Sequence, residues 1–233
     1  MTPHLVPPRA LGSLLAALML TLCMTGCGGG GDQLHLTSSG TTIVAFGDSV
    51  TAGTGAPADS SYPARLGEFL GVPVVNAGVP GDTTADGLRR LPRLLDLDPW
   101  LVIVELGGND FLRRMPAEGA EDNLAAILGA LAGQGIAVVL VEVDPPVLGG
   151  AYSGLHQRLA ERFGVRLVKG VVEEVLADPA RKSDQIHPNA AGYADIARAV
   201  ARVVRPLVEE RQEAGLPVRA PVRSGESRRR EAA

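Results

Sequence analysis

The sequence predicts an α/β fold, namely a flavodoxin-like three-layer α/β/α sandwich with a five-stranded parallel sheet. Three observations support this prediction. Short apolar runs alternate with amphipathic stretches from residue 41 to residue 213. One run, "WLVIVEL", is nearly all apolar, as expected where helices cover both faces of a parallel sheet. The number of strand-like runs suits a doubly wound sheet of the flavodoxin type.

The elements follow one another along the chain with little space between them. The strands are predicted at residues 41–46, 72–79, 100–106, 136–143 and 165–170. Helices are predicted at residues 60–70, 83–97, 120–135, 153–164 and 189–212. Pro63 falls in the first turn of its helix, where the missing N–H is tolerated. Pro92 lies inside the second helix, which we expect it to kink or shorten.

The N-terminal residues 1–26 are typical of an export signal of the lipoprotein type. Arg9 precedes the apolar run "LGSLLAALMLTL", which is too short to span a bilayer. The next residues, "MTGC", resemble the lipobox of bacterial lipoproteins, although Met24 stands where leucine is usual. The resemblance implies lipidation of Cys27 and a membrane-anchored lipoprotein that faces the periplasm or the cell exterior. An ordinary cleavable signal with an incidental cysteine is the alternative.

The rest of the chain divides into three parts. Residues 27–40 are predicted to be a Gly-rich flexible tether, residues 41–213 the folded domain, and residues 214–233 a disordered basic tail. Both cysteines precede the domain, so its core contains no disulfide. The net charge of −4, with basic residues scattered outside the tail, argues against a nucleic-acid partner. The oligomeric state stays open, with a monomer as the expectation.

Polar residues follow several of the predicted strands. Ser49 comes after the first strand, Gly78 closes the second, Asn109 follows the third, and "DQIHPN", with Asp184 and His187, precedes the last helix. In a parallel sheet these turns open on one edge, so we expect them to meet in space. A serine hydroxyl needs a base within hydrogen-bond reach to act as a nucleophile, and an imidazole needs a partner that orients it. The residues therefore suit acyl transfer, with Ser49 as nucleophile, His187 as base and Asp184 as its partner.

Such a reaction also needs donors for a developing oxyanion. The backbone N–H groups of Ser49 and Gly78, with the side-chain amide of Asn109, could supply three. Taken singly, each segment has a structural explanation as a turn, a strand end or a helix cap. Their joint occurrence at successive strand ends favours catalysis.

The four segments "FGDSVTAG", "VVNAGVPGDTTADGLRRLP", "VELGGND" and "DQIHPNAAGY" resemble the blocks of the SGNH, or GDSL, hydrolases. The likeness is closest to the bacterial periplasmic enzymes of this family with thioesterase, lysophospholipase and arylesterase activities, and covers roughly residues 41–208. The resemblance implies the fold proposed above, the triad of Ser49, Asp184 and His187, and Ser49, Gly78 and Asn109 as oxyanion donors. The presumed anchor and the arginine-rich tail depart from the family pattern.

Other site classes are disfavoured. "GTGAPA" lacks the third glycine of a dinucleotide fingerprint, no Walker lysine follows a glycine loop, and the GxSxG elbow is absent. The four histidines lack HExxH spacing, so we expect neither a metal nor a cofactor. Two alternatives to a lipid-directed esterase or thioesterase stay open: an esterase for acetylated carbohydrates, and a surface-anchored binding module without turnover.

The expected substrate is a small acyl ester or a lipid. Two loops, "FLRRMP" and "PPVLGGAY", should border the acyl site. Their apolar side chains either bind the acyl chain or simply pack beneath the loops. The candidate substrate-binding residues are Phe111, Leu112, Met115, Val147 and Leu148.

Overall fold

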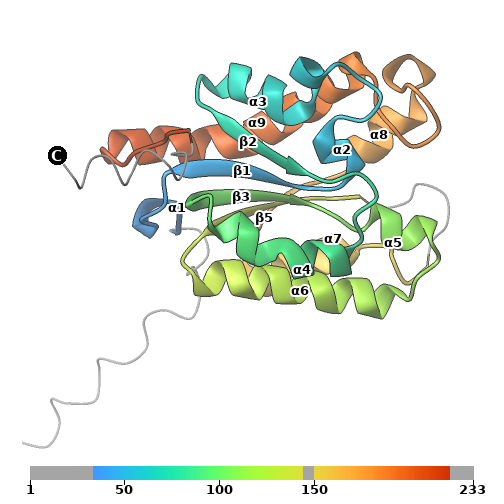
Figure 1. The fold of residues 1–233 in the computed structure, drawn as a ribbon, viewed down its shortest axis with the longest axis horizontal. Helices are drawn as coiled ribbons and strands as arrows, with labels where there is room; N and C mark the ends of the chain where they lie inside the picture. Colours follow the sequence, from blue (N-terminus) through green and yellow to red (C-terminus); the bar gives the residue numbers. More distant parts are fainter. Residues whose placement is uncertain (1–33, 144–149, 221–233) are drawn as a thin grey trace, which may run out of the picture.

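The computed structural model describes residues 34–143 and 150–220, which form a single parallel sheet between two layers of helices (Figure 1). The strand order is β2-β1-β3-β4-β5 and every neighbouring pair is parallel. The strands are β1 (Thr42–Gly47), β2 (Val74–Gly78), β3 (Pro99–Glu105), β4 (Ala137–Val141) and β5 (Arg166–Val168). The predicted flavodoxin-like α/β fold is therefore confirmed.

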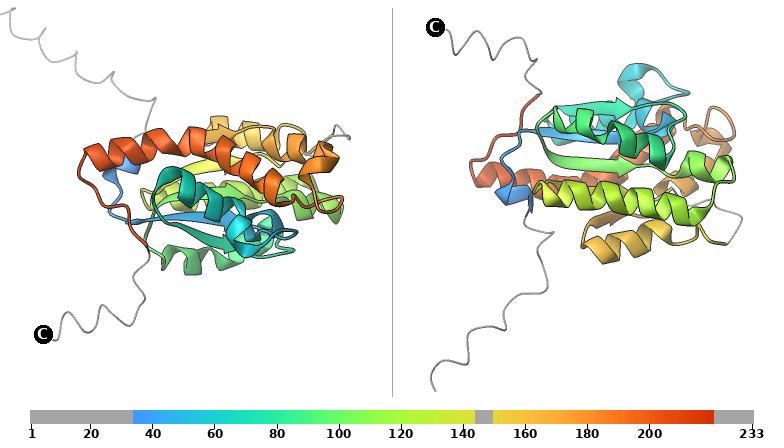
Figure 2. Two further views of the ribbon diagram at one scale, coloured as in Figure 1. Left: turned by 90° about the horizontal axis from the view of Figure 1, so that it is seen from above. Right: turned by 60° about the horizontal axis from the view of Figure 1, so that its bottom comes forward.

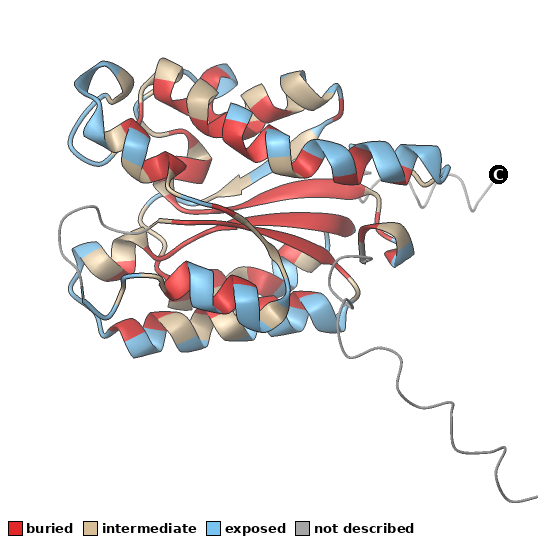
Figure 3. Cartoon of the chain, turned by 180° about the vertical axis from the view of Figure 1, so that it is seen from behind, coloured by how far each residue is buried: buried red, intermediate tan, exposed pale blue. Residues whose placement is uncertain are grey.

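Two separate apolar cores hold the helices on the sheet. One core lies under α3 (Tyr62–Leu70), α8 (Val171–Ala177) and α9 (Ala190–Glu213), and the other under α4 (Thr84–Leu95), α6 (Ala117–Gly133) and α7 (Leu155–Phe163). Figure 2 shows the two layers from above and from below. Side chains alternate along β1, so that Ile43 points into the first core and Val44 into the second. The central strands are buried throughout their length, as Figure 3 shows.

Local signals in the sequence define the helix ends. Thr83 begins α4 with a capping box, in which its side chain accepts from the N–H of Asp86 and the Asp86 carboxylate accepts from the N–H of Thr83. Asn189 caps α9 by accepting from two backbone N–H groups. The helix α4 continues through Pro92 and ends at Leu95, two residues before the end expected from the sequence.

Several short elements were not predicted. These are the helix α8 and five shorter elements, α1 (Leu34–Thr37), α2 (Ser49–Ala52), η1 (Ala58–Ser60), α5 (Gly108–Leu112) and η2 (Pro179–Arg181). Each is too short to produce a clear helical period in the sequence. Both α2 and α5 follow the carboxyl ends of central strands, and both therefore lie at the edge of the sheet where the candidate site was expected (Figure 1).

The predicted tether is too long at its C-terminal end. Residues 34–40 begin with the short helix α1 (Leu34–Thr37), and His35 in this segment is buried. The guanidinium of Arg211, a fully buried residue of α9, donates to the carbonyls of His35, Ser38 and Gly40. These hydrogen bonds order a segment whose composition suggested flexibility.

The predicted disordered tail also begins too early. The Nε of Arg211 donates to the carbonyl of Pro217, and the N–H of Arg219 donates to the carbonyl of Thr41. The predicted signal peptide, Cys27, and residues 221–233 of the tail lie outside the described residues. Within residues 34–143 and 150–220, none of the helices has the length and apolar character needed to cross a membrane.

Candidate active site

Ser49 stands at the first position of α2, directly after β1. Asp48 precedes it as the helix N-cap, and its Oδ1 accepts the N–H of Val50 at 3.0 Å. Ser49 itself is half-buried, whereas Asp48 is 3% exposed. The turn therefore buries the aspartate under the helix and leaves the serine accessible at the carboxyl edge of the sheet.

A continuous chain of hydrogen bonds joins Ser49, His187 and Asp184. The distance from Ser49 Oγ to His187 Nε2 is 3.1 Å, and the distance from His187 Nδ1 to Asp184 Oδ2 is 2.8 Å. The serine and the histidine are 138 positions apart in sequence, so only the fold brings them together. The structure thus assembles the three residues as the sequence suggested.

The loop before α9 is held in shape by its own hydrogen bonds. Oδ1 of Asp184 accepts the N–H groups of Ile186 and His187 at 2.8 and 2.9 Å, and the N–H of Ser183 donates to the carbonyl of His187. The hydrogen bond from His187, together with these backbone N–H groups, lowers the pKa of Asp184. Asp184 is thus an ionised partner for an imidazolium.

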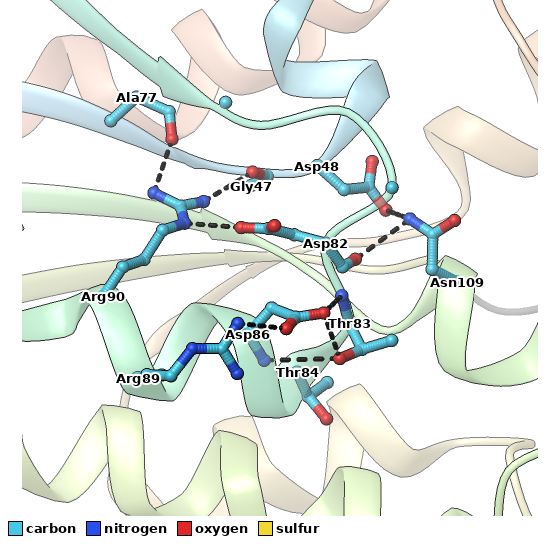
Figure 4. Close-up of polar contacts among 12 residues, drawn as sticks. Gly47, Asp48, Ala77, Asp82, Thr83, Thr84, Asp86, Arg89, Arg90 and Asn109 are labelled. Atoms are coloured by element: carbon cyan, nitrogen blue, oxygen red, sulfur yellow. Dashed lines mark hydrogen bonds and ion pairs between the residues drawn. The ribbon is translucent and has the colours of Figure 1, made fainter.

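Asn109 approaches the serine turn from α5. Its Nδ2 donates to Asp48 Oδ2 at 2.8 Å and to the carbonyl of Asp82 at 3.0 Å (Figure 4). The amide is therefore held between the turn that carries Ser49 and the turn that follows β2. The predicted proximity of Asn109 to Ser49 agrees with the structure, because both line one cavity.

The structure does not support the prediction of Gly78 as a donor. Its N–H already donates to Oδ1 of Asn76 at 2.9 Å. A Cβ at this position would lie 2.2 Å from the backbone nitrogen of Ala52, so the glycine is needed for close packing of β2 against α2. The role of Gly78 is structural.

Gly81 lies three residues after Gly78, in the turn before α4. It has a φ of 85°, which favours glycine, and its N–H has no hydrogen-bond partner among the described residues. The next residue is Asp82, whose carbonyl accepts the amide of Asn109. The signal in the sequence was "PGDTT", a turn directly before a helix cap, where a backbone N–H is left unpaired.

Two buried carboxyl groups lie beneath the nucleophile turn. Burial raises the pKa of Asp48 to about 6, against hydrogen bonds from Val50 and Asn109 that lower it. Glu105, at the end of β3, is 0% exposed, and burial together with the nearby Asp48 raises its pKa well above the usual range. Burial therefore favours the neutral form of both carboxyl groups.

Glu105 was missed by the sequence analysis, in which it ended an apolar strand. Its Oε2 accepts the N–H and the hydroxyl of Thr51 at 3.1 and 2.7 Å, and its Oε1 has no partner among the described residues. Because Thr51 belongs to the same short helix as Ser49, this carboxyl group fixes the helix on the end of β3.

A cavity of about 480 Å³ opens beside Ser49 and Asn109. It lies between α5 and α8, and most of its walls are apolar. The apolar wall residues are Val50, Phe111, Leu112, Val143, Val172, Leu176, Ala177 and Ile186. The wall from α8 was not foreseen, because the sequence analysis assigned no element to residues 171–177.

The predicted substrate-binding residues divide into three groups. Phe111 and Leu112 line the cavity, as expected. Met115 does not line it, because the chain turns away from α5 at Arg114, where φ is 56°. Val147 and Leu148 lie outside the described residues. Within the part of the chain that the structure describes, no cluster of three or more histidine, cysteine or acidic side chains is arranged to hold a metal ion.

Comparison with known sequences gives consistent matches. The model of the GDSL-like Lipase/Acylhydrolase family matches residues 45–194. An arylesterase of Vibrio mimicus is 33% identical over 200 residues, which cover 81% of this chain and 96% of that protein. The thioesterase 1/protease 1/lysophospholipase L1 of Escherichia coli K12 is 36% identical over 176 residues, which cover 72% of this chain and 85% of that protein.

Solved structures give the same result. The crystal structure of TesA matches with a TM-score of 0.67 and 33% identity, over 72% of this chain and 99% of that one. AlinE4, an esterase of the SGNH-hydrolase family, matches with a TM-score of 0.58 and 38% identity, over 72% of this chain and 96% of that one.

Proposed function

We propose that Ser49, His187 and Asp184 form the catalytic triad of this chain, which belongs to the GDSL-like lipase/acylhydrolase family and is an ester hydrolase. The observation that supports this most directly is the 3.1 Å separation of Ser49 Oγ and His187 Nε2, which is within hydrogen-bond reach. A binding module without turnover would not need a base at this distance from an accessible serine.

The reaction proceeds by two acyl transfers. His187 Nε2 accepts the proton of Ser49 as Oγ bonds to the acyl carbon, and the resulting imidazolium is stabilised by Asp184. The imidazolium then protonates the leaving alcohol or thiol as its bond to the acyl carbon breaks. Water then attacks the acyl carbon while its proton passes to the same imidazole. The bond from Ser49 Oγ to the acyl carbon breaks, the imidazolium returns the proton to Oγ, and the carboxylic acid leaves.

The oxyanion is stabilised by the N–H groups of Ser49 and Gly81 and by the amide of Asn109. Neither of the two N–H groups has a hydrogen-bond partner among the described residues. Asn109 already uses both amide hydrogens, so the oxyanion replaces the longer of its two bonds, the one to the carbonyl of Asp82. Loss of one such donor typically lowers kcat by about 10²–10³-fold.

The substrate is an acyl ester or thioester with an apolar chain. The cavity beside Ser49 supports this, because its apolar walls suit a hydrocarbon chain derived from a lipid. Glu173, Lys182 and Gln185 also line it, so the preference for a hydrocarbon chain over an acetylated carbohydrate rests on the apolar majority of the wall. The arylesterase and thioesterase names of the relatives are consistent with a relaxed choice of leaving group.

The chain is exported and anchored to a membrane through Cys27, as a monomer. The sequence "MTGC" after a short apolar run supports the anchor. Residues 34–40 pack at the end of the sheet opposite α2 and α5 (Figure 1). A tether leaving at this end would keep the opening beside Ser49 on the side of the domain away from the attachment point.

Hydrolysis of p-nitrophenyl esters and acyl thioesters of two to sixteen carbons tests the proposal. The Ser49→Ala variant should lose turnover while its melting temperature stays near that of the wild type, since Ser49 is half-buried at a turn. Ser153→Ala, a change at an exposed serine of another loop, is the matched control and should retain full activity. Turnover that survives in Ser49→Ala would place the nucleophile elsewhere.

A further inference from the structure

Arg90 of α4 donates hydrogen bonds to three segments of the chain (Figure 4). Its Nε bonds to Asp82 Oδ2 at 2.5 Å, its Nη1 to the carbonyl of Ala77 at 2.8 Å, and its Nη2 to the carbonyl of Gly47 at 2.8 Å. The three acceptors belong to the turn before α4, to the end of β2 and to the end of β1.

Two of these contacts are close in sequence to proposed oxyanion donors. Gly47 lies two residues before Ser49, and Asp82 directly follows Gly81. The carbonyl of Asp82 also accepts the amide of Asn109. One guanidinium group therefore sets the spacing between the turn that supplies the Ser49 N–H and the turn that supplies the Gly81 N–H.

The surroundings of Arg90 keep it in one position. Its side chain is 21% exposed and that of Asp82 is 13% exposed, so solvent screens their ion pair only in part. The guanidinium carbon lies 4.1 Å from the centre of the Phe46 ring, whose residue is fully buried in β1. A planar guanidinium can donate to three fixed acceptors at once, which the single ammonium group of lysine cannot do with the same geometry.

We propose that Arg90, with Asp82 as its partner, is a positioning residue for the oxyanion hole; this rests on the proposed function of Ser49. Arg90 does not touch the reacting atoms and acts through the two turns. The acyl cavity is lined by α2, α5, α8, Val143 and the loop before α9, and none of its lining residues belongs to α4. Loss of Arg90 therefore weakens the stabilisation of the transition state and leaves the binding of the acyl chain nearly unchanged.

The neighbouring Arg89 supplies a matched control. It belongs to the same helix, its side chain is 74% exposed, and its ion pair is with Asp86 one turn earlier on the helix surface. Replacing Arg89 by methionine removes the same charge and the same number of donors from α4 without affecting the contacts to Gly47, Ala77 or Asp82.

The test compares Arg90→Met, Arg90→Lys, Asp82→Asn and Arg89→Met with the wild type on p-nitrophenyl butyrate. We expect Arg90→Met to lower kcat by about 10–100-fold, which is less than the loss of a whole donor, because the donors are displaced and not removed. KM should change by less than about threefold. Arg90→Lys should recover part of the loss. Arg89→Met should match the wild type in both constants.

Affinity for an alkyl trifluoromethyl ketone, which forms a tetrahedral oxyanion on a serine, provides a second readout. It should fall in Arg90→Met by the same factor as kcat, because both depend on the same donors. The double variant of Arg90→Met and Asp82→Asn should be no less active than Arg90→Met alone. If Arg90→Met fails to fold, Asp82→Asn, which conserves side-chain volume, tests the positioning role of the Arg90–Asp82 pair in its place.

The two proposals fail in different ways. Wild-type turnover that is equal to that of Ser49→Ala would overturn the proposed function. An active wild type that depends on Ser49, with Arg90→Met and Asp82→Asn within threefold of Arg89→Met in kcat, would overturn the role of Arg90. A rise in KM at constant kcat would overturn it as well.

Discussion

Replacement of Asp184 by asparagine tests how the triad orients its histidine. Oδ1 of Asp184 accepts two backbone N–H groups, while Oδ2 bonds to Nδ1 of His187 at 2.8 Å. An asparagine that keeps its oxygen on the two N–H groups must turn its NH₂ toward Nδ1. A donor at that position favours the tautomer with the proton on Nε2, and this tautomer cannot accept the proton of Ser49.

The size of the effect follows from the exposure of Asp184. In a buried triad the same substitution lowers kcat by about 10⁴-fold. Here the aspartate side chain is 53% exposed, so solvent already screens part of its charge and can help to stabilise the imidazolium. We therefore expect a loss of about 10²–10³-fold in kcat, below the buried case, with KM nearly unchanged.

Steady-state hydrolysis of p-nitrophenyl butyrate near pH 8 is the appropriate assay, and Asp184→Ala is the comparison. The asparagine variant keeps the acceptor for Ile186 and His187 and should melt near the wild-type temperature, whereas the alanine variant loses that acceptor. A kcat within threefold of the wild type in Asp184→Asn would refute the orienting role of this carboxylate.

Three further predictions concern stability and specificity. Because burial raises the pKa of Asp48 to about 6, ionisation of this carboxyl group destabilises the folded state. The free energy of unfolding of the wild type, relative to that of Asp48→Asn, should therefore fall by up to about 3 kcal/mol from pH 4 to pH 7. Urea titrations that give the same difference between the two proteins at every pH would contradict this. Val172→Phe should narrow the cavity and lower kcat/KM for esters of long acyl chains more than for acetate esters. Equal losses of kcat/KM for the two kinds of ester would exclude the cavity as the acyl site. Arg211→Met should lower the free energy of unfolding by about 3 kcal/mol without changing kcat, because three buried carbonyls and the partly buried carbonyl of Pro217 lose their donor far from Ser49. A loss below about 1 kcal/mol would show that water replaces the guanidinium.

Much of the site could be predicted because it depends on topology. Ser49 and Asn109 follow strands whose carboxyl ends meet at one edge once the sheet is parallel, and the Asp184–His187 pair precedes α9, which begins at the same edge. The alternation of apolar runs and amphipathic stretches was sufficient to predict that sheet, since β1, β3 and β4 are nearly continuous apolar runs.

The errors arose where function depends on the direction of single groups. Gly78 and Gly81 are both plausible donors in the sequence, and only the bond from Gly78 N–H to Asn76 separates them. The roles of Glu105 and Arg90 depend on partners in other elements, which no local pattern reveals. Likewise, residues 34–40 are ordered by Arg211, more than 170 positions away, against their own composition.

Covalent labelling of Ser49 tests the central claim most directly. A p-nitrophenyl alkylphosphonate should form a bond from phosphorus to Ser49 Oγ as the bond to p-nitrophenolate breaks. Intact-mass and peptide mass spectrometry should then show one adduct per chain on the peptide that contains Ser49, none in Ser49→Ala, and slower formation in His187→Ala. An adduct on another residue that abolishes turnover, or full turnover after complete modification of Ser49, would contradict the account.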